Sequence, residues 1–377
     1  MSKTREHIRR LKSGFVLVLA CAVPAACGGD GDGLPGPEPE LPADEGVTPS
    51  AGCADGVPAG RPLALPDDQV GGQSLAATVN GLGYAYSTTS YRRNGLLGPE
   101  GAEDMVELEA TVRRVYRPDP GRSVLVGVSE GGMVAGLAAE RHPALFDGAL
   151  AACGPVGSLR GQLDYFVDFR VVFDYLFPGV IPGTAVDIPA DVNARWETTY
   201  VPAVVLALAT SLAKARELVS ITEVPVERDD AIAIAVTAVG ILWYNVKGTA
   251  DARQRLGGQP FDNSTRVYAG SQDDAGLNAG VARFTADPAA LVAMNEFETT
   301  GNLQVPVVTL HTTGDPIVPF EQQSLYTAKV TRAGATSSLT QNAVERYGHC
   351  NFEANELIGA FSSLIGRVRG PVAVTNR

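Results

Sequence analysis

The chain has 377 residues, of which 45% are hydrophobic and 19% charged, so it has enough apolar side chains for one large domain or two smaller ones. Its formal net charge of -12 argues against nucleic-acid binding, which requires a basic surface. The sequence also lacks the HExxH and paired-cysteine spacings of zinc sites and the glycine-rich phosphate loop. We therefore expect no metal and no cofactor.

The N-terminus has the pattern of an export signal, which we place at residues 1–26. A positively charged start precedes the apolar stretch "GFVLVLACAV", which is too short to span a bilayer comfortably, and small residues follow. Cys27 then resembles the lipid-modified cysteine of bacterial lipoproteins, although Pro24 stands where those proteins prefer a branched aliphatic residue. We expect an exported bacterial protein that is either anchored to the cell envelope by a lipid on Cys27 or released.

Residues 27–52 are Gly, Pro, Asp and Glu with almost nothing to bury, which predicts a disordered tether before a domain over residues 53–377. That domain holds three cysteines, Cys53, Cys153 and Cys350. Outside the cytoplasm one pair should be oxidised, and the sequence leaves the pairing open. Because Cys350 follows a histidine, we prefer it as one half of the bridge, with Cys153 as its partner.

Strand-like and helix-like segments alternate through much of this domain. We expect strands at 83–91, 123–128, 146–153 and 305–313 and helices at 100–114 and 131–141. Residues 343–350 and 356–368 then predict a strand, a loop and a closing helix. The run at 123–128 is apolar throughout, which is typical of a strand buried on both faces. The alternation predicts a mostly parallel α/β sheet flanked by helices.

Between residues 156 and 300 the pattern becomes helical, with helices expected at Leu159–Phe177, Pro202–Val219 and Asp229–Val246. We interpret this block as a helical cap inserted after the strand that ends near Cys153. Phenylalanines recur in steps of three and four along its first helix. We expect them to form the cap's own core, and a role in lining an acyl pocket is the alternative.

The stretch "VLVGVSEGG" places Ser129 between Gly127 and Gly131, in the GxSxG pattern of a nucleophile elbow. An apolar strand precedes the serine and an alanine-rich helix follows it. A serine on such a strained turn projects above the sheet, and glycines let strand and helix approach each other. The backbone N–H of Glu130 would then donate to a developing oxyanion.

A serine nucleophile needs a base, and the sequence has only four histidines. His7 lies in the export signal, His142 ends the helix after the elbow, and His311 lies within a strand. His349 lies in a loop between a strand and the last helix, where the base of a Ser-acid-His order belongs. We therefore predict His349 as the base.

The acid should follow the preceding strand, and "HTTGDPIVPF" places Asp315 there. A carboxylate at this point can accept a hydrogen bond from the imidazole and stabilise its charged form. A turn-forming aspartate before proline is the competing interpretation. Asp273 and Asp274 are weaker alternatives because they come before that strand.

These segments resemble the α/β-hydrolase superfamily, and in particular its exported bacterial esterases and peptidase-like members. The resemblance is carried by "GYAYSTTSYRRNG", "VLVGVSEGGMVAGLAAERHPALFDGALAACGP", "VPVVTLHTTGDPIVPF" and "YGHCNF". It implies Ser129 as nucleophile, Asp315 as acid and His349 as base. It also implies that the helical block is the lid that these enzymes insert at the same point.

The sequence departs from this superfamily before residue 83. A strand and a His-Gly loop, which supplies the second oxyanion N–H, normally precede "GYAYSTT". Residues 56–83 contain no His-Gly and no convincing strand, so a central strand between those at 83–91 and 123–128 is expected to be missing. Gly60 is one candidate for a substitute donor.

The leading hypothesis is a secreted or cell-surface serine hydrolase that cleaves carboxylic esters through an acyl-enzyme. A peptidase or aminopeptidase of the same fold is one alternative, because the same triad cleaves amides. A catalytically impaired binding protein that has lost the oxyanion loop is another. The expected partner is a small ester or a short peptide, and the sequence leaves the oligomeric state open.

Overall fold

The computed structural model describes residues 15–21, 75–89, 91–93, 95–115 and 121–369. Here six strands form one sheet in the order β2-β1-β3-β4-β5-β6, and all neighbouring strands pair in parallel. The strands are β1 (Phe15–Cys21), β2 (Ala85–Thr88), β3 (Arg122–Val128), β4 (Gly148–Ala152), β5 (Val307–Gly314) and β6 (Leu339–Tyr347). The expectation of a mostly parallel α/β sheet is confirmed.

Strand β1 occupies the position where we expected a strand to be missing. Leu17 pairs with Tyr86 of β2 on one side and with Val124 of β3 on the other. The expectation of a missing strand is therefore wrong, and Phe15–Cys21 lies in the sheet although it belongs to the predicted export signal. A short continuous apolar run is typical both of a buried parallel strand and of the apolar part of a signal, which explains the error.

Several predictions concern residues outside the described part of the chain. The tether expected at 27–52, the candidate lipid site Cys27, Cys53 and the candidate substitute donor Gly60 all lie there. Export itself and the boundary at residue 26 stay predictions.

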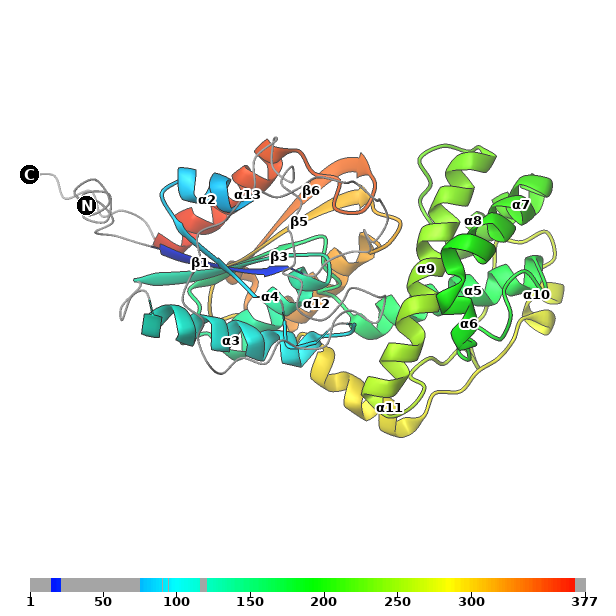
Figure 1. Ribbon diagram of the computed structural model, residues 1–377, viewed down its shortest axis with the longest axis horizontal. Coiled ribbons are helices and arrows are strands. Elements are labelled where there is room, and N and C mark those ends of the chain that lie inside the picture. The colour runs from blue at the N-terminus through cyan, green and yellow to red at the C-terminus, as the bar shows by residue number, and fades with distance from the viewer. Residues whose placement is uncertain (1–14, 22–74, 90, 94, 116–120, 370–377) are drawn as a thin grey trace, which may run out of the picture.

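Helices cover both faces of the sheet. Helices α2 (Leu75–Gly81) and α13 (Ala354–Arg369) lie on one face, and α3 (Gly98–Val115), α4 (Glu130–Arg141) and α12 (Glu321–Arg332) lie on the other (Figure 1). A short 3-10 helix, η3 (Thr336–Ser338), precedes β6.

The side chains of β3 alternate between these two layers, as expected for a strand buried on both sides. Val124 packs in one apolar cluster with Leu364 of α13, whereas Leu125 packs in the other with Met133 of α4. All three strand residues from Val124 to Val126 are buried. This double burial holds the end of β3, and the serine that follows it, in a fixed place.

The chain between β4 and β5 is helical and extends beyond the sheet as a separate layer, coloured green to yellow in Figure 1. Its elements are α5 (Leu159–Leu176), α6 (Ala190–Ala194), the π-helical turn η1 (Trp196–Tyr200), α7 (Val201–Thr210), α8 (Leu212–Thr222), α9 (Ala231–Leu256), α10 (Asp274–Gly280), α11 (Pro288–Met294) and the 3-10 turn η2 (Asn295–Phe297). We call this block the cap. The single helix expected at Pro202–Val219 is instead two, α7 and α8, because Ser211 leaves the helical region (φ -142°, ψ 69°).

Helix α9 has the length and apolar composition of a membrane span, but half of its most apolar stretch is buried inside the cap. It packs against α5, α7 and α8. The phenylalanines of α5, from Phe166 to Phe177, lie in the same buried cluster as Ile234 and Leu242 of α9. They form the cap's own core, as expected.

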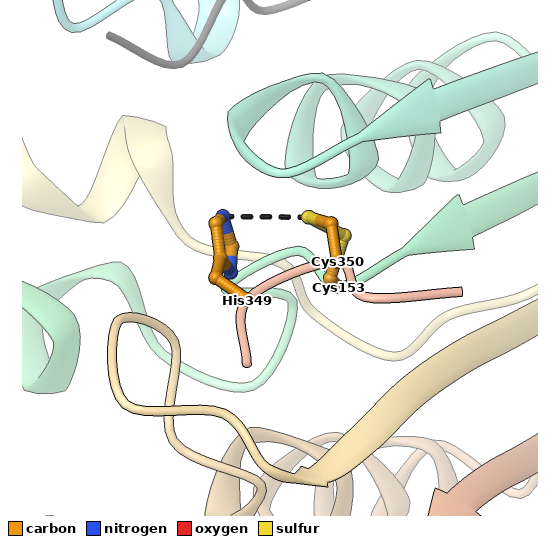
Figure 2. Close-up of side chains that lie close together, drawn as sticks. All are labelled: Cys153, His349 and Cys350. Atoms are coloured by element: carbon orange, nitrogen blue, oxygen red, sulfur yellow. Dashed lines mark hydrogen bonds between the residues drawn. A yellow bond between two sulfur atoms is a disulfide. The ribbon is translucent and has the colours of Figure 1, made fainter. Parts of the chain in front are cut away.

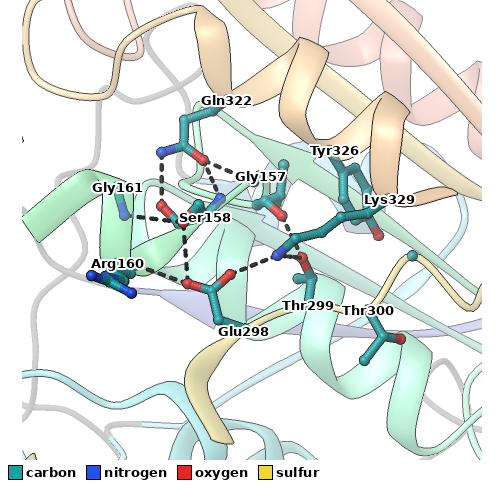
Figure 3. A network of polar contacts seen from close by, with 12 residues as sticks. Gly157, Ser158, Arg160, Gly161, Glu298, Thr299, Thr300, Gln322, Tyr326 and Lys329 are labelled. Carbon is teal, nitrogen blue, oxygen red and sulfur yellow. Dashed lines mark hydrogen bonds and ion pairs between the residues drawn. The ribbon is translucent and has the colours of Figure 1, made fainter. Parts of the chain in front are cut away.

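The two ends of the cap meet on α12 (Figure 3). At the outgoing end, Gln322 Oε1 accepts hydrogen bonds from the N–H groups of Gly157 (2.8 Å) and Ser158 (2.7 Å). At the returning end, Glu298 accepts from the N–H of Arg160 at 2.8 Å and pairs with Lys329 Nζ at 2.6 Å. The point where the cap leaves and rejoins the sheet is therefore held by polar contacts that range from buried to exposed.

Candidate active site

Ser129 stands on the sharp turn between β3 and α4. Its backbone has φ 57° and ψ -126°, a left-handed conformation that costs a non-glycine residue energy. Its N–H donates to Ala152 O of β4 at 2.9 Å, and its carbonyl accepts from Gly132 N at 2.8 Å. The strained turn is thus fixed to the neighbouring strand on one side and to its own helix on the other.

Glycine at position 127 is required by the close approach of strand and helix. A Cβ at Gly127 would lie 1.8 Å from Gly131 O, well inside contact distance. A Cβ at Gly132 would lie 2.9 Å from Ala152 O. The spacing of glycines around the serine therefore follows from backbone packing, as the elbow pattern predicts.

The structure brings Ser129, His349 and Asp315 together in one hydrogen-bonded row. Ser129 Oγ lies 2.8 Å from His349 Nε2, and His349 Nδ1 lies 2.7 Å from Asp315 Oδ2. Because an ionised carboxylate only accepts, Nδ1 carries the proton and Nε2 accepts from the serine hydroxyl. The three residues follow β3, β5 and β6, so all lie at the carboxyl edge of the sheet.

Asp315 is fully buried and surrounded by donors. Its Oδ1 accepts from the N–H groups of Ile317 and Val318, each at 2.9 Å. Burial raises the pKa of Asp315, but hydrogen bonds from His311 and His349 outweigh burial and lower the pKa to about 2. The carboxylate therefore stays ionised beside the imidazole.

A second buried histidine, His311 of β5, lies behind this row. Gln323 Nε2 donates to His311 Nδ1 at 3.0 Å, so the proton of His311 is on Nε2. That N–H donates to Val318 O at 2.8 Å and lies 3.5 Å from Asp315 Oδ2. The orientation of Gln323 is set in turn by Thr309 Oγ1, which donates to its Oε1 at 2.5 Å. Sequence reasoning placed His311 in its strand but missed this role, although its spacing of four residues from Asp315 was a signal.

The N–H of Glu130 begins α4, and the first N–H groups of a helix have no partner within it. This N–H lies directly after the serine, as predicted for an oxyanion donor. The residues that follow β1, where the superfamily supplies its second donor, lie outside the described part of the chain. Within the described part of the chain, the N–H of Glu130 is the oxyanion donor that the sequence predicts.

The side chain of Glu130 was not foreseen. Its Oε1 accepts from Leu97 N at 2.7 Å, which ties the segment after β2 to the start of α4. The pKa of this carboxyl is raised to about 7. Burial is the largest cause; the hydrogen bond from Leu97 opposes it, and the nearby charge of Asp251 adds to it. Asp251, on α9 of the cap, accepts from Leu96 N at 2.7 Å. The loop beside the nucleophile is thus bonded to both the sheet layer and the cap.

The cap also contacts the loops that carry the acid and the base. Tyr165 Oη donates to Pro316 O at 2.6 Å, next to Asp315. The hydroxyls of Thr237 on α9 and Tyr347, two residues before His349, lie 2.7 Å apart. Ser129 is only 8% exposed. Ser129 is therefore buried, and the cap lies against the loops that carry Asp315 and His349.

The preferred disulfide between Cys153 and Cys350 is confirmed. Cys153 directly follows β4, and Cys350 directly follows His349, so the bridge lies at the carboxyl edge of the sheet (Figure 2). Cys350 Sγ lies 3.4 Å from His349 Nε2. The bridge therefore links the loop of His349 to the end of β4, the strand whose Ala152 O accepts a hydrogen bond from Ser129 N.

Comparison with known proteins gives similar structures only. No family model matches the chain, and no curated protein matches it. An acylaminoacyl peptidase from Pyrococcus horikoshii is 13% identical over 76% of this chain and 30% of its own length, with a TM-score of 0.34. The rice cell wall degrading esterase LipA from Xanthomonas oryzae is 12% identical over 75% of this chain and 70% of its own (TM-score 0.34). The esterase PF2001 from Pyrococcus furiosus is 10% identical over 76% and 66% (TM-score 0.33).

The chain spans about a third of the length of the acylaminoacyl peptidases that it matches. Similarity at this level carries no information about activity or substrate. The fold is identified from the sheet and the turn after β3. Parallel strands lie on both sides of β3, and a serine with a strained backbone follows it. An aspartate and a histidine follow two later strands, in that order. The described part of the chain has the α/β-hydrolase fold, as its sequence resemblance led us to expect.

Proposed function

We propose that the protein is a serine hydrolase that cleaves carboxylic esters. The observation that carries the proposal is the hydrogen-bonded row from Ser129 through His349 to Asp315, with distances of 2.8 and 2.7 Å. A serine hydroxyl becomes a useful nucleophile when a base can take its proton and a carboxylate orients that base.

In the first half of the reaction, Ser129 Oγ attacks the ester carbonyl while His349 Nε2 takes its proton. The oxygen of the tetrahedral intermediate becomes negative and accepts a hydrogen bond from Glu130 N–H. Asp315 stabilises the imidazolium through Nδ1 and stays ionised. His349 then donates its proton to the alkoxide leaving group, and the acyl group remains on Ser129.

In the second half, His349 takes a proton from water, which attacks the acyl-enzyme. The tetrahedral intermediate collapses, His349 returns the proton to Ser129 Oγ, and the carboxylic acid leaves. The contacts of Tyr165 with Pro316 and of Thr237 with Tyr347, which hold the cap against the loops of the acid and the base, support a small ester or a short peptide as the substrate rather than a large polymer.

The test is covalent labelling with a fluorophosphonate probe. Wild-type protein should be labelled, the Ser129→Ala variant should not, and the Ser324→Ala variant on the exposed face of α12 should be labelled like wild type. Folded wild-type protein that takes no label would instead support an impaired binding protein. A panel of aryl esters of different acyl length, compared with aminoacyl anilides, separates an esterase from a peptidase.

We also propose that the protein works outside the cytoplasm. The Cys153–Cys350 disulfide supports this, because disulfides persist in oxidising compartments. Cell fractionation with detection of the native chain tests the location, and a cytoplasmic protein with reduced cysteines would contradict it.

A further inference from the structure

The disulfide places two sulfur atoms beside the catalytic histidine. The ligand atoms of Cys153, Cys350 and His349 all lie within 4.8 Å of one another (Figure 2). In the oxidised protein the sulfurs are bonded to each other and cannot act as thiolates. A reductant of the dithiol or phosphine class would supply two electrons and become oxidised, and each sulfur would take one proton.

The histidine is already in the form that a metal needs. Its Nδ1–H donates to Asp315, so the lone pair of Nε2 is directed away from the carboxylate, to the side where Ser129 Oγ lies 2.8 Å and Cys350 Sγ 3.4 Å away. Histidines that bind zinc usually donate their other ring N–H to a carboxylate in this way. Asp315 and His349 are therefore oriented for a metal as well as for proton transfer.

Bonds other than the disulfide hold the three residues in place. The loop of His349 is fixed to β5 by Gly348 N to Gly314 O at 3.1 Å and by Thr312 Oγ1 to Gly348 O at 2.6 Å. On the other side, Cys153 N donates to Leu310 O at 2.7 Å. Since these contacts do not involve sulfur, reduction leaves both thiols close to Nε2.

We propose that reduction of the Cys153–Cys350 bridge creates a Zn²⁺ site made of the two thiolates and His349 Nε2. Two thiolates and one imidazole are a typical zinc ligand set, and the fourth position is open to water. Zinc displaces the two thiol protons when it binds. The bound metal occupies the lone pair that otherwise accepts the proton of Ser129, so zinc blocks the hydrolase. The inhibition, but not the binding, rests on the proposed function.

The first measurement is zinc binding by the full chain. Protein is reduced with a phosphine, freed of reductant under nitrogen, mixed with zinc and passed over a desalting column, and its metal content is measured. Reduced wild type should retain one zinc more than oxidised wild type. The Cys153→Ser/Cys350→Ser double variant keeps the other three cysteines, so it measures any zinc that those bind. In reduced wild type, Co²⁺ should give a thiolate charge-transfer band that the double variant lacks.

The second measurement is ester hydrolysis. One equivalent of zinc should abolish the activity of the reduced wild type, a chelator should restore it, and the oxidised enzyme should be unaffected. Asp315→Asn should weaken zinc binding by about 10–100-fold, because it removes the carboxylate behind the ligand.

Three results would overturn the inference. One is a reduced wild type that binds no more zinc than the double variant. Another is a reduced, zinc-loaded enzyme that stays active. The third is loss of the near-ultraviolet circular dichroism signal on reduction, because the three ligands meet only in the folded chain. If the protein has no esterase activity at all, the zinc and cobalt measurements still decide whether the site exists.

Discussion

At the scale of single residues, the active site depends on a backbone that only glycine permits at one position. Gly127 precedes the elbow serine by two residues, and any side chain there would collide with Gly131 O. The GxSxG pattern could be recognised in the sequence because this steric requirement fixes the residue type at nearby positions. The meeting of Ser129 with Asp315 and His349 could be predicted only from the order of strands that carry them.

We expect Gly127→Ala to abolish activity and to lower stability by several kcal/mol, because its Cβ would lie 1.8 Å from Gly131 O and the backbone must shift. Gly136→Ala, in helix α4 that follows the elbow, is the matched control, since a Cβ there would lie 3.6 Å from its nearest neighbour. Thermal unfolding and ester hydrolysis measure both variants. An active, stable Gly127→Ala protein would show that the elbow does not have this geometry.

His311 is a positioning residue rather than a reacting one. Replacing it with Phe removes a donor from Asp315 and leaves Gln323 Nε2 without the acceptor Nδ1. We expect kcat to fall by about 10- to 100-fold, as for a slightly misplaced catalytic group. Without the hydrogen bond from His311, the Asp315 carboxylate would stabilise the imidazolium of His349 more strongly. The acidic limb of the pH profile should therefore move to higher pH.

The matched control for this variant is His142→Phe, at the end of α4, which should leave kcat and the pH profile unchanged. A lower kcat for His311→Phe with an unmoved acidic limb would assign His311 a purely structural role. Sequence reasoning did not find this contribution, because its one trace in the chain is the four-residue spacing between His311 and Asp315, which is not a motif by itself.

At the scale of elements, the main surprise is strand β1. The run "FVLVLAC" is apolar and seven residues long, which suits both an export signal and a strand buried between two others. The local pattern cannot distinguish the two, because the outcome depends on whether β2 and β3 pair with each other or with a strand between them. The division of the expected helix at Pro202–Val219 into α7 and α8 has a similar origin, since the apolar pattern runs through Ser211 without interruption.

Removal of residues 1–26 deletes β1 and separates β2 from β3. We expect a chain that begins at Cys27 to lose cooperative unfolding and ester hydrolysis, because both neighbours of β1 lose their backbone hydrogen bonds. Deleting residues 370–377 is the control. A chain from Cys27 that unfolds cooperatively and is fully active would instead favour the export-signal interpretation of the whole segment.

At the scale of the whole molecule, buried carboxyls control how stability depends on pH. Burial raises the pKa of Glu130 and of Asp164 to about 7, and that of Asp168 to about 6. In the unfolded chain such groups titrate near pH 4. Between about pH 4 and pH 7 the folded protein binds more protons than the unfolded chain. The free energy of unfolding therefore falls as the pH rises through 7. Asp315 acts in the opposite direction, but only below about pH 4.

We therefore expect the melting temperature to be higher at pH 5 than at pH 8, with a shift of roughly 2–4 °C for each kcal/mol involved. Glu130→Gln should make the dependence shallower, since the amide cannot ionise. Glu103→Gln on the exposed face of α3 should leave it unchanged. A melting temperature that rises steadily from pH 5 to pH 8 would contradict the assignment of these buried carboxyls.

The junction between cap and sheet has a consequence for how the sequence of such a protein can evolve. Because Ser158 and Glu298, at the two ends of the cap, are bonded to each other at 3.2 Å, the cap departs and returns at a single point. Shortening, lengthening or exchanging everything between them would leave β4 and β5 where they are. The cap can thus be altered within one continuous stretch of the gene while the two strands that flank it stay joined at the same junction.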